Sequence, residues 1–155
     1  MNDSTVLDPI DQDVADLADH ALQGHAALMR GDLDTYFGHL AVSEDFTLMA
    51  PFGGPPTRGR LSSERWESVG RFFRNGRNAS LELVQAWRGA DMAVLAVIER
   101  AHVEVGGLQG QDWALRVTLA FRKQAGRWLL VHRHADPLVA GISLEQAAAL
   151  ARAPR

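Results

Sequence analysis

The sequence predicts a single α+β domain in which three N-terminal helices pack on an antiparallel sheet. Up to about residue 75, apolar residues recur every three or four positions, which is helical spacing; from about residue 79 they alternate every two positions, as in strands. Helices followed by a run of strands are typical of an α+β domain rather than of βαβ units. The 155 residues suit one hydrophobic core.

The N-terminal half is expected to contain three helices separated by turns. Gly31 suits a helix C-cap, Asp32 can begin the next helix, and Ser62 or Ser63 can cap the third, which Gly76 would end. A brief strand and a loop rich in proline and glycine lie between the second and third helices. The predicted segments are helices at 11–31, 32–40 and 62–76, a strand at 46–49 and a loop at 51–56.

The C-terminal half is expected to form an antiparallel meander followed by one more helix. Glycine-containing connections between the period-two segments suit hairpins. Ser143 and Gln146 have the spacing of a capping box, which predicts a last helix. The predicted strands cover 79–88, 92–105, 111–123 and 127–135. We therefore expect a flexible N-terminus (1–10), one domain (11–137), and a C-terminal helix and tail (138–155).

Composition argues against several classes of partner. The net charge of −3 gives no electrostatic reason to bind nucleic acid. The absence of cysteine excludes disulfides and thiolate metal sites. The chain has no apolar run long enough to span a bilayer, and its acidic first residues lack the order of a signal peptide. We expect a cytoplasmic protein with no membrane partner.

The strands at 92–105 and 111–123 are rich in apolar residues on both faces. Three short helices can cover only one face of a four-stranded sheet. A second copy of the chain covering the other face would complete the burial, so the sequence predicts a homodimer formed through the convex face of the sheet.

Glu99 interrupts an otherwise apolar row on its predicted strand and therefore needs a partner or a raised pKa. One interpretation pairs Glu99 with Arg116 at the floor of a pocket, with Thr118 beside them. The alternative places Arg116 and Thr118 on a solvated face and has Glu99 capped by a local group. The alternation of residues alone leaves both open.

The last predicted strand places His132, His134 and Asp136 on one side with Trp128 and Leu130. Two histidines at this spacing occur in zinc sites, but hydrogen-bonded structural histidines are commoner. We therefore expect no metal and no cofactor. One histidine, His134, is expected in the pocket as a hydrogen-bond donor or proton shuttle, and His132 is expected to pack near Trp128.

Several stretches resemble the nuclear transport factor 2-like (NTF2-like) superfamily, in its SnoaL-like and ketosteroid isomerase-related branches. Residues 29–34 and 45–54 resemble the opening of SnoaL-like domains. Residues 116–122 and 126–136 resemble the C-terminal hairpin of the DUF4440 branch, which is related to the association domain of calcium/calmodulin-dependent kinase II. The resemblance spans roughly residues 15–137 and implies a cone-shaped α+β fold, with three N-terminal helices packed on a strongly bent antiparallel sheet and a pocket between helices and sheet.

Departures from the resembled families limit what function carries over. Ketosteroid isomerases place a general-base Asp before the Pro of an Asp-Pro-x-Gly segment, where this chain has Ala50 before Pro51. Their oxyanion hole needs a Tyr, and the only one here is Tyr36 in the second predicted helix, so steroid isomerisation is not expected. The last strand also resembles that of metal-free iota-type carbonic anhydrases, which implies only that His134 and Asp136 face the cavity.

These observations lead to two functional hypotheses. The first is a small-molecule-binding SnoaL-like protein, or a cofactor-free acid/base enzyme of the isomerase, cyclase or dehydratase kind acting on a small carbonyl compound. Its ligand would be apolar or carboxylate-bearing. The catalytic candidates are Glu99, His134 and Asp136, and the expected binding residues are Arg116, Thr118, Glu99, His134, Trp113, Trp66, Trp87 and Phe72. The second hypothesis is a non-catalytic dimerisation or hub module with a vestigial pocket.

Overall fold

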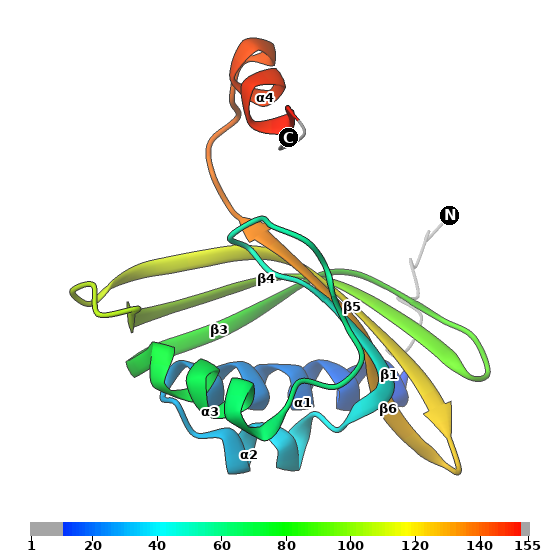
Figure 1. The fold of residues 1–155 in the computed structure, drawn as a ribbon. Helices are drawn as coiled ribbons and strands as arrows, with labels where there is room; N and C mark the ends of the chain where they lie inside the picture. The colour runs from blue at the N-terminus through cyan, green and yellow to red at the C-terminus, as the bar shows by residue number, and fades with distance from the viewer. Residues whose placement is uncertain (1–10, 153–155) are drawn as a thin grey trace, which may run out of the picture.

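The computed structural model describes residues 11–152 and has three helices on one side of a curved six-stranded sheet (Figure 1). A fourth helix stands on the opposite side. The prediction for residues 1–10 lies outside the described residues. The elements are α1 (Gln12–Met29), α2 (Leu33–His39), β1 (Val42–Met49), β2 (Thr57–Arg58), α3 (Ser63–Phe72), β3 (Phe73–Arg88), β4 (Met92–Val105), β5 (Gln111–Gln124), β6 (Arg127–Pro137) and α4 (Leu144–Ala151).

The helices begin where the sequence places capping residues. The Asp11 carboxylate accepts from the backbone N–H groups of the first turn of α1, and Asp32 does the same for α2. Ser62 rather than Ser63 caps α3. Gly31 follows the last turn of α1 with a φ of 73°, a conformation that glycine adopts without strain. The predicted helix starts at Asp32 and Ser62 and the predicted glycine after the first helix are therefore confirmed.

The sheet has the strand order β2-β1-β6-β5-β4-β3. The meander from β3 to β6 is antiparallel, as predicted, but β1 pairs with β6 in parallel. The predicted fold class, a bent sheet covered by N-terminal helices, is confirmed. The sequence missed the parallel edge because the period-two pattern of a short strand carries no information about its direction.

The start of β3 differs most from the prediction. The third helix ends at Phe72 instead of Gly76, and β3 begins at the next residue. The first part of the strand is irregular, because its register with β4 shifts twice between Arg74 and Ser80, and Asn75 and Asn78 have positive φ. This polar stretch shows no alternation in the sequence, so it was assigned to the helix end and a turn.

The main core lies between α1, α2 and the inner face of the sheet, which is the face toward the helices. Leu95, Val97, Leu119 and Phe121 are almost fully buried there. Alternate residues on the same strands point to the outer face, where α1–α3 do not reach. Among residues 11–152, no helix is both long and apolar enough to cross a membrane.

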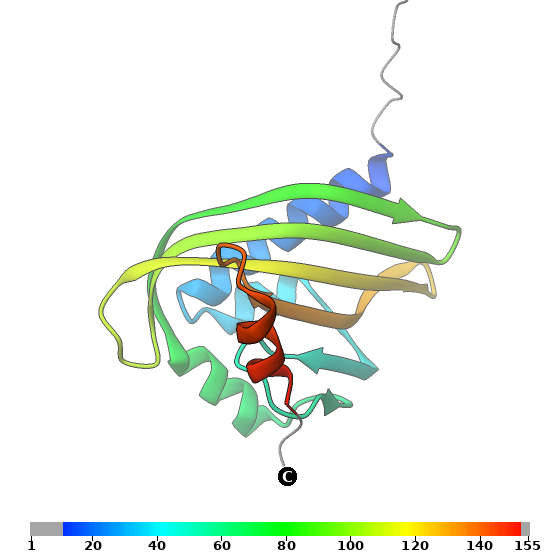
Figure 2. The same ribbon diagram turned by 90° about the horizontal axis from the view of Figure 1, so that it is seen from above.

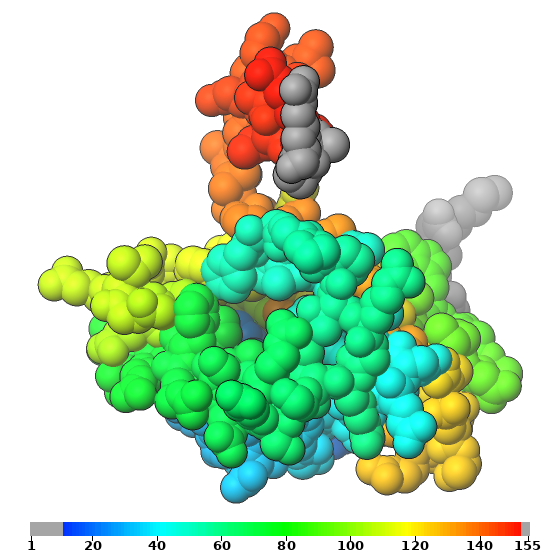
Figure 3. Space-filling view, in the orientation of Figure 1, coloured from blue at the N-terminus to red at the C-terminus, as the bar shows by residue number. Residues whose placement is uncertain are grey.

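Residues 138–152 leave the body after β6, and α4 stands clear of the sheet (Figures 1 and 3). Ser143 and Gln146 form the predicted capping box. Seen from above, α4 lies over the outer side of the sheet, near the end of β6 (Figure 2). The predicted division between a domain ending at 137 and a separate C-terminal helix stays a prediction.

Candidate functional site

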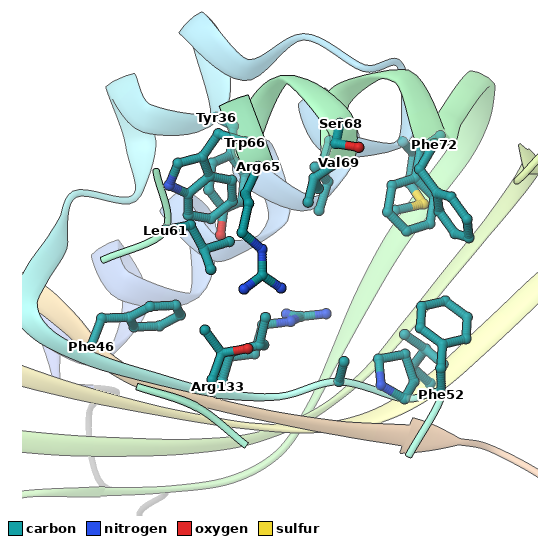
Figure 4. Close-up of a pocket in the computed structure, with 18 residues that line it drawn as sticks. Tyr36, Phe46, Phe52, Leu61, Arg65, Trp66, Ser68, Val69, Phe72 and Arg133 are labelled. Carbon is teal, nitrogen blue, oxygen red and sulfur yellow. The ribbon is translucent and has the colours of Figure 1, made fainter. Parts of the chain in front are cut away.

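A cavity of about 390 Å³ opens between α3 and the inner face of the sheet (Figure 4). Its walls are mostly aliphatic and aromatic, with Phe46 and Leu61 at one end and Phe52 and Phe72 at the other. The volume is at the lower end of the range for small-molecule sites, about 300–1,000 Å³. The charged side chains that line the cavity are two arginines, Arg65 and Arg133.

Arg133 reaches the cavity from β6 and is held by a buried carboxylate. Its Nη1 and Nη2 donate to the two carboxylate oxygens of Glu99 at 2.9 and 2.7 Å. The side chains of Glu99 and Arg133 are 3% and 17% exposed. Burial by itself would raise the pKa of Glu99, but the charge and hydrogen bonds of Arg133 outweigh it and lower this pKa below its ordinary value. Glu99 is therefore ionised at neutral pH.

His25 supports the same ion pair from α1. It is buried, its Nε2 donates to the backbone carbonyl of Arg100 at 3.0 Å, and its Nδ1 lies 3.6 Å from a carboxylate oxygen of Glu99. Glu99 is thus fixed between α1 and β6. Because both of its oxygens accept from Arg133, this carboxylate is occupied in orienting the guanidinium toward the cavity.

Tyr36 lines the cavity from α2 and is packed against Trp66, with ring centroids 5.9 Å apart. Burial raises the pKa of the phenol, while the nearby Arg133 partly opposes this rise. The phenol therefore stays protonated and can donate a hydrogen bond. The chain's only tyrosine, which the sequence interpretation set aside as a pocket donor, is part of the cavity wall.

Arg65 enters from the opposite wall. It lies on the first turns of α3, and its guanidinium points down into the cavity toward that of Arg133 (Figure 4). Within residues 11–152 it forms no ion pair with a carboxylate. Since the charge of Arg133 is offset by Glu99, the cavity carries about one excess positive charge.

Two of the predicted wall residues, Trp66 and Phe72, line the cavity. Glu99 lies behind Arg133 rather than on the wall. Trp113 is on the inner face but touches the cavity only through Phe52, whose ring centroid is 6.1 Å away. The cavity lining contains Tyr36 and two arginines but no Asp, Glu or His from the described part of the chain.

The other predicted site residues lie on the outer face. Of the two interpretations left open for Arg116, its pairing with Glu99 is wrong and its placement on a solvated face with Thr118 holds, because Arg116 donates to Asp136 at 2.7 Å on that exposed face. Thr118 and His134 are paired neighbours there, and Trp87 is 58% exposed. A ligand role for these side chains would have to be on the outer face.

The expectation that His134 and Asp136 face the cavity failed because of a β-bulge. Ala120 is opposite His132 and the next residue of β5 is opposite Leu130, which leaves Val131 without a partner. Trp128 and Leu130 consequently point inward, whereas His132 points outward and shares a hydrogen bond of 2.7 Å with Thr47. Among the described residues, no three His, Asp or Glu side chains converge as in a metal site.

The sequence contained signals for the two arginines that were missed. Arg133 was the lone charge in the apolar row Leu129, Val131, Ala135, just as Glu99 was in its own row. Two isolated opposite charges on rows of one sheet predict a pair. Arg65 precedes Val69 and Phe72 by four and seven positions, which places it on the apolar side of α3.

The family model for the SnoaL-like domain matches residues 19–140. The chain belongs to the SnoaL-like family. A comparison with curated proteins gives no match. The cavity therefore lies within a SnoaL-like domain, between the helices and the bent sheet that the family resemblance implied.

Solved structures share the fold of this SnoaL-like domain at low sequence identity. A candidate dehydratase of the NTF2-like family from Streptomyces avermitilis is 20% identical, with a TM-score of 0.67 over 84% of this chain and 99% of that one. An NTF2-like protein from Cytophaga hutchinsonii is 15% identical, with a TM-score of 0.63 over 84% and 100%. The CaMKII association domain of C. elegans is 18% identical, with a TM-score of 0.56 over 81% and 93%. These likenesses establish the NTF2-like cone fold.

Proposed function

We propose that this SnoaL-like protein binds a small molecule with an apolar body and a carboxylate end. The observation that carries the proposal is the excess positive charge of Arg65 at the edge of a largely apolar cavity of about 390 Å³, whose other charged group, Arg133, is already paired with Glu99. Arg65 is accessible to solvent, and a guanidinium recognises a carboxylate through two parallel hydrogen bonds. A ligand carboxylate between Arg65 and Arg133 would also relieve the repulsion of the two guanidinium groups.

Binding is favoured over a vestigial pocket because side chains do not fill the cavity. The walls contributed by Trp66, Phe46 and Phe72 offer a flat apolar surface that suits a ring or a short alkyl chain. Tyr36 would donate a hydrogen bond to a second polar group of the ligand. An isomerase-, cyclase- or dehydratase-like reaction is the second candidate, because the buried, protonated phenol of Tyr36 can polarise a carbonyl.

The test compares 2-naphthylacetate with its neutral amide, 2-naphthylacetamide, by isothermal titration calorimetry. A charge-assisted hydrogen bond contributes about 1.5–3 kcal/mol, so the wild-type protein should bind the carboxylate at least about tenfold more tightly than the amide. In Arg65→Gln the preference should disappear. Arg71→Gln is the matched control, because Arg71 lies on the same helix, pairs with Glu67 and does not line the cavity.

Equal affinity for acid and amide in the wild-type protein, or a preference that survives in Arg65→Gln, would contradict the carboxylate assignment. If neither compound binds, the hypothesis of a non-catalytic dimerisation or hub module with a vestigial pocket is favoured. Turnover of an activated carbonyl compound that is lost in Tyr36→Phe would support the enzymatic candidate instead.

We also propose that the protein self-associates through the outer face of its sheet. Trp87 and Met92 are exposed there, beside half-buried Val94 and Ile98. An antiparallel sheet with one solvated face normally carries polar residues on that face. Two of the structural neighbours are association domains by name, one of them from C. elegans. Light scattering at micromolar concentration tests the proposal: we expect the wild-type protein to be a dimer and Ile98→Glu to be a monomer.

A further inference from the structure

The C-terminal arm, residues 138–152, makes a backbone hydrogen bond to the sheet at its start. The N–H of Leu138 donates to the carbonyl of Ala114 at 2.9 Å, and beyond this point the chain leaves the sheet. The arm then forms α4, which stands free on the outer side in the space-filling view (Figure 3). Within the described part of the chain, no residue of α4 is buried.

The arm carries apolar side chains that no other part of residues 11–152 covers. Leu144 and Leu150 of α4 are 79% and 80% exposed, and Val139 and Ile142 before it are also exposed. An isolated helix of eight residues is too short to be stable in water, since most helix stability in proteins comes from packing one apolar face. The capping box of Ser143 and Gln146 fixes where α4 begins but buries nothing. The arm therefore needs a partner surface.

The outer face of the sheet provides an apolar surface on the side from which the arm rises. We define the outer band by its apolar members on β3 and β4: Trp87, Met92, Val94, Ala96 and Ile98. Trp87 is directly opposite Val94 in the register of these strands, so the members are contiguous. Figures 1 and 2 show α4 on this side of the sheet, away from α1–α3.

The area of the outer band is too small for a stable dimer by itself. Residues 92–98 extend about 20 Å over six steps of about 3.3 Å, and the two strands β3 and β4 together are about 10 Å wide, which gives roughly 200 Å². A stable interface buries about 800 Å² on each partner. The apolar side chains of an arm from the second copy would supply part of the difference.

The charges of this face favour an uncharged occupant. Arg116 is paired with Asp136, and Arg100 with Glu82 at 2.9 Å, so these ions are neutralised within the chain. The helix α4 contains a single charged residue, Glu145. A nearly neutral apolar helix matches such a surface better than a strongly charged partner does.

We propose that the arm of each copy packs on the outer band of a second copy, so that two arms clasp a symmetric dimer. The six residues between Pro137 and α4 can extend about 20 Å, which lets α4 cross from one copy to the other. Two-fold symmetry makes both contacts identical. This inference rests on the proposed self-association and adds the segment that secures it.

The absence of cysteine from the chain makes cross-linking the direct test. Leu150→Cys in a chain carrying a large tag is mixed with Ala96→Cys in an untagged chain, and a short bis-maleimide is added. We expect a product that joins the two chain sizes. A variant with both cysteines that cross-links only within one chain, or the absence of any product, would overturn the proposal.

A second measurement keeps the arm separate from self-association itself. Leu144→Glu/Leu150→Glu should raise the dimer dissociation constant at least about tenfold, since burying one leucine contributes about 1.5–3 kcal/mol. Ala149→Glu, on the opposite side of α4, is the control and should leave the constant unchanged. Sedimentation over a dilution series reads this out, with circular dichroism to confirm folding.

The outcomes distinguish the two proposals. A wild-type chain that is monomeric at all concentrations refutes self-association and the arm contact with it. A dimer whose dissociation constant is the same in wild type, in Leu144→Glu/Leu150→Glu and in Ala149→Glu refutes the arm contact alone. A dimer weakened only by the double variant supports both.

Discussion

Replacing Glu99 by glutamine removes the charge that holds Arg133 and changes the side-chain volume very little. Both partners are largely withdrawn from water, and their oxygens and nitrogens are 2.7–2.9 Å apart. At an effective dielectric constant of about 20, two charges separated by about 4 Å attract each other by roughly 4 kcal/mol. Removing one member of a buried pair costs about 3–5 kcal/mol, because the other charge stays buried without compensation.

We therefore expect Glu99→Gln to lower the free energy of unfolding by about 3–5 kcal/mol, measured by urea denaturation with tryptophan fluorescence. Glu82→Gln is the control, because it breaks the pair of Glu82 with Arg100, which has a similar length. The side chains of Glu82 and Arg100 are 60% and 47% exposed. An exposed pair contributes at most about 1 kcal/mol. Equal losses in the two variants would refute the argument from burial.

The same pair predicts how stability depends on pH. The pKa of Glu99 is lower in the folded protein than its ordinary value of 4.5. As pH falls below 4.5, the unfolded chain takes up the proton first, so the stabilisation present at neutral pH is lost as pH passes down through the folded pKa. In Glu99→Gln the free energy of unfolding should therefore fall less steeply at acidic pH than in the wild type. The same dependence on acidic pH in both proteins would mean that other carboxylates govern it.

Three further predictions address other parts of the chain. Gly31→Ala should destabilise the protein by about 1–3 kcal/mol, because φ is 73° and a Cβ would lie 2.9 Å from the carbonyl oxygen of Phe73. Gly38→Ala is the control and should not destabilise it, since a Cβ there meets nothing within 4 Å. Thermal melts of both variants test this. Hydrogen bonds from Arg122 and Ser43 lower the pKa of Asp45 to about 2, so its NMR titration should move toward 3.8 in Arg122→Gln, and an unchanged midpoint would contradict the pairing. Conversion of a Δ5-3-ketosteroid should be undetectable by absorbance, since Ala50 at the cavity wall has no basic group, and isomerase-like turnover would reveal another base.

The helix caps and the meander could be predicted because each depends on local chemistry. A Ser or Asp before an apolar helical pattern, or a glycine between two alternating segments, specifies its element without reference to the rest of the fold. The start of α3 at Ser62 and the capping box at Ser143 are examples. The parallel pairing of β1 with β6 depends on residues more than 80 positions apart, and no local pattern encodes it.

The site was harder to predict because a single unpaired residue reverses a strand face. Val131 is ordinary in the sequence, yet its bulge turns His132 and His134 outward and Arg133 inward. The need of Glu99 for a partner was predicted correctly, but the partner was not, since the alternation of residues left Arg116 as one of two interpretations and did not point to Arg133. The isolated charge in an apolar row therefore indicated the region of the site. The alternation along the strand did not indicate which side chains face the cavity.

The passage of α3 into β3 without any intervening residue has a consequence for how a molecule could enter the cavity. Phe72 ends the helix and Phe73 begins the strand, so the C-terminal end of α3 is anchored to the sheet. The N-terminal end follows the segment between β1 and α3, where Gly53, Gly54 and Gly59 all have positive φ. We expect entry and exit rates to be set by rearrangement of this glycine-rich segment, which contributes Phe52 to the cavity lining, while the wall formed by α3 keeps its shape.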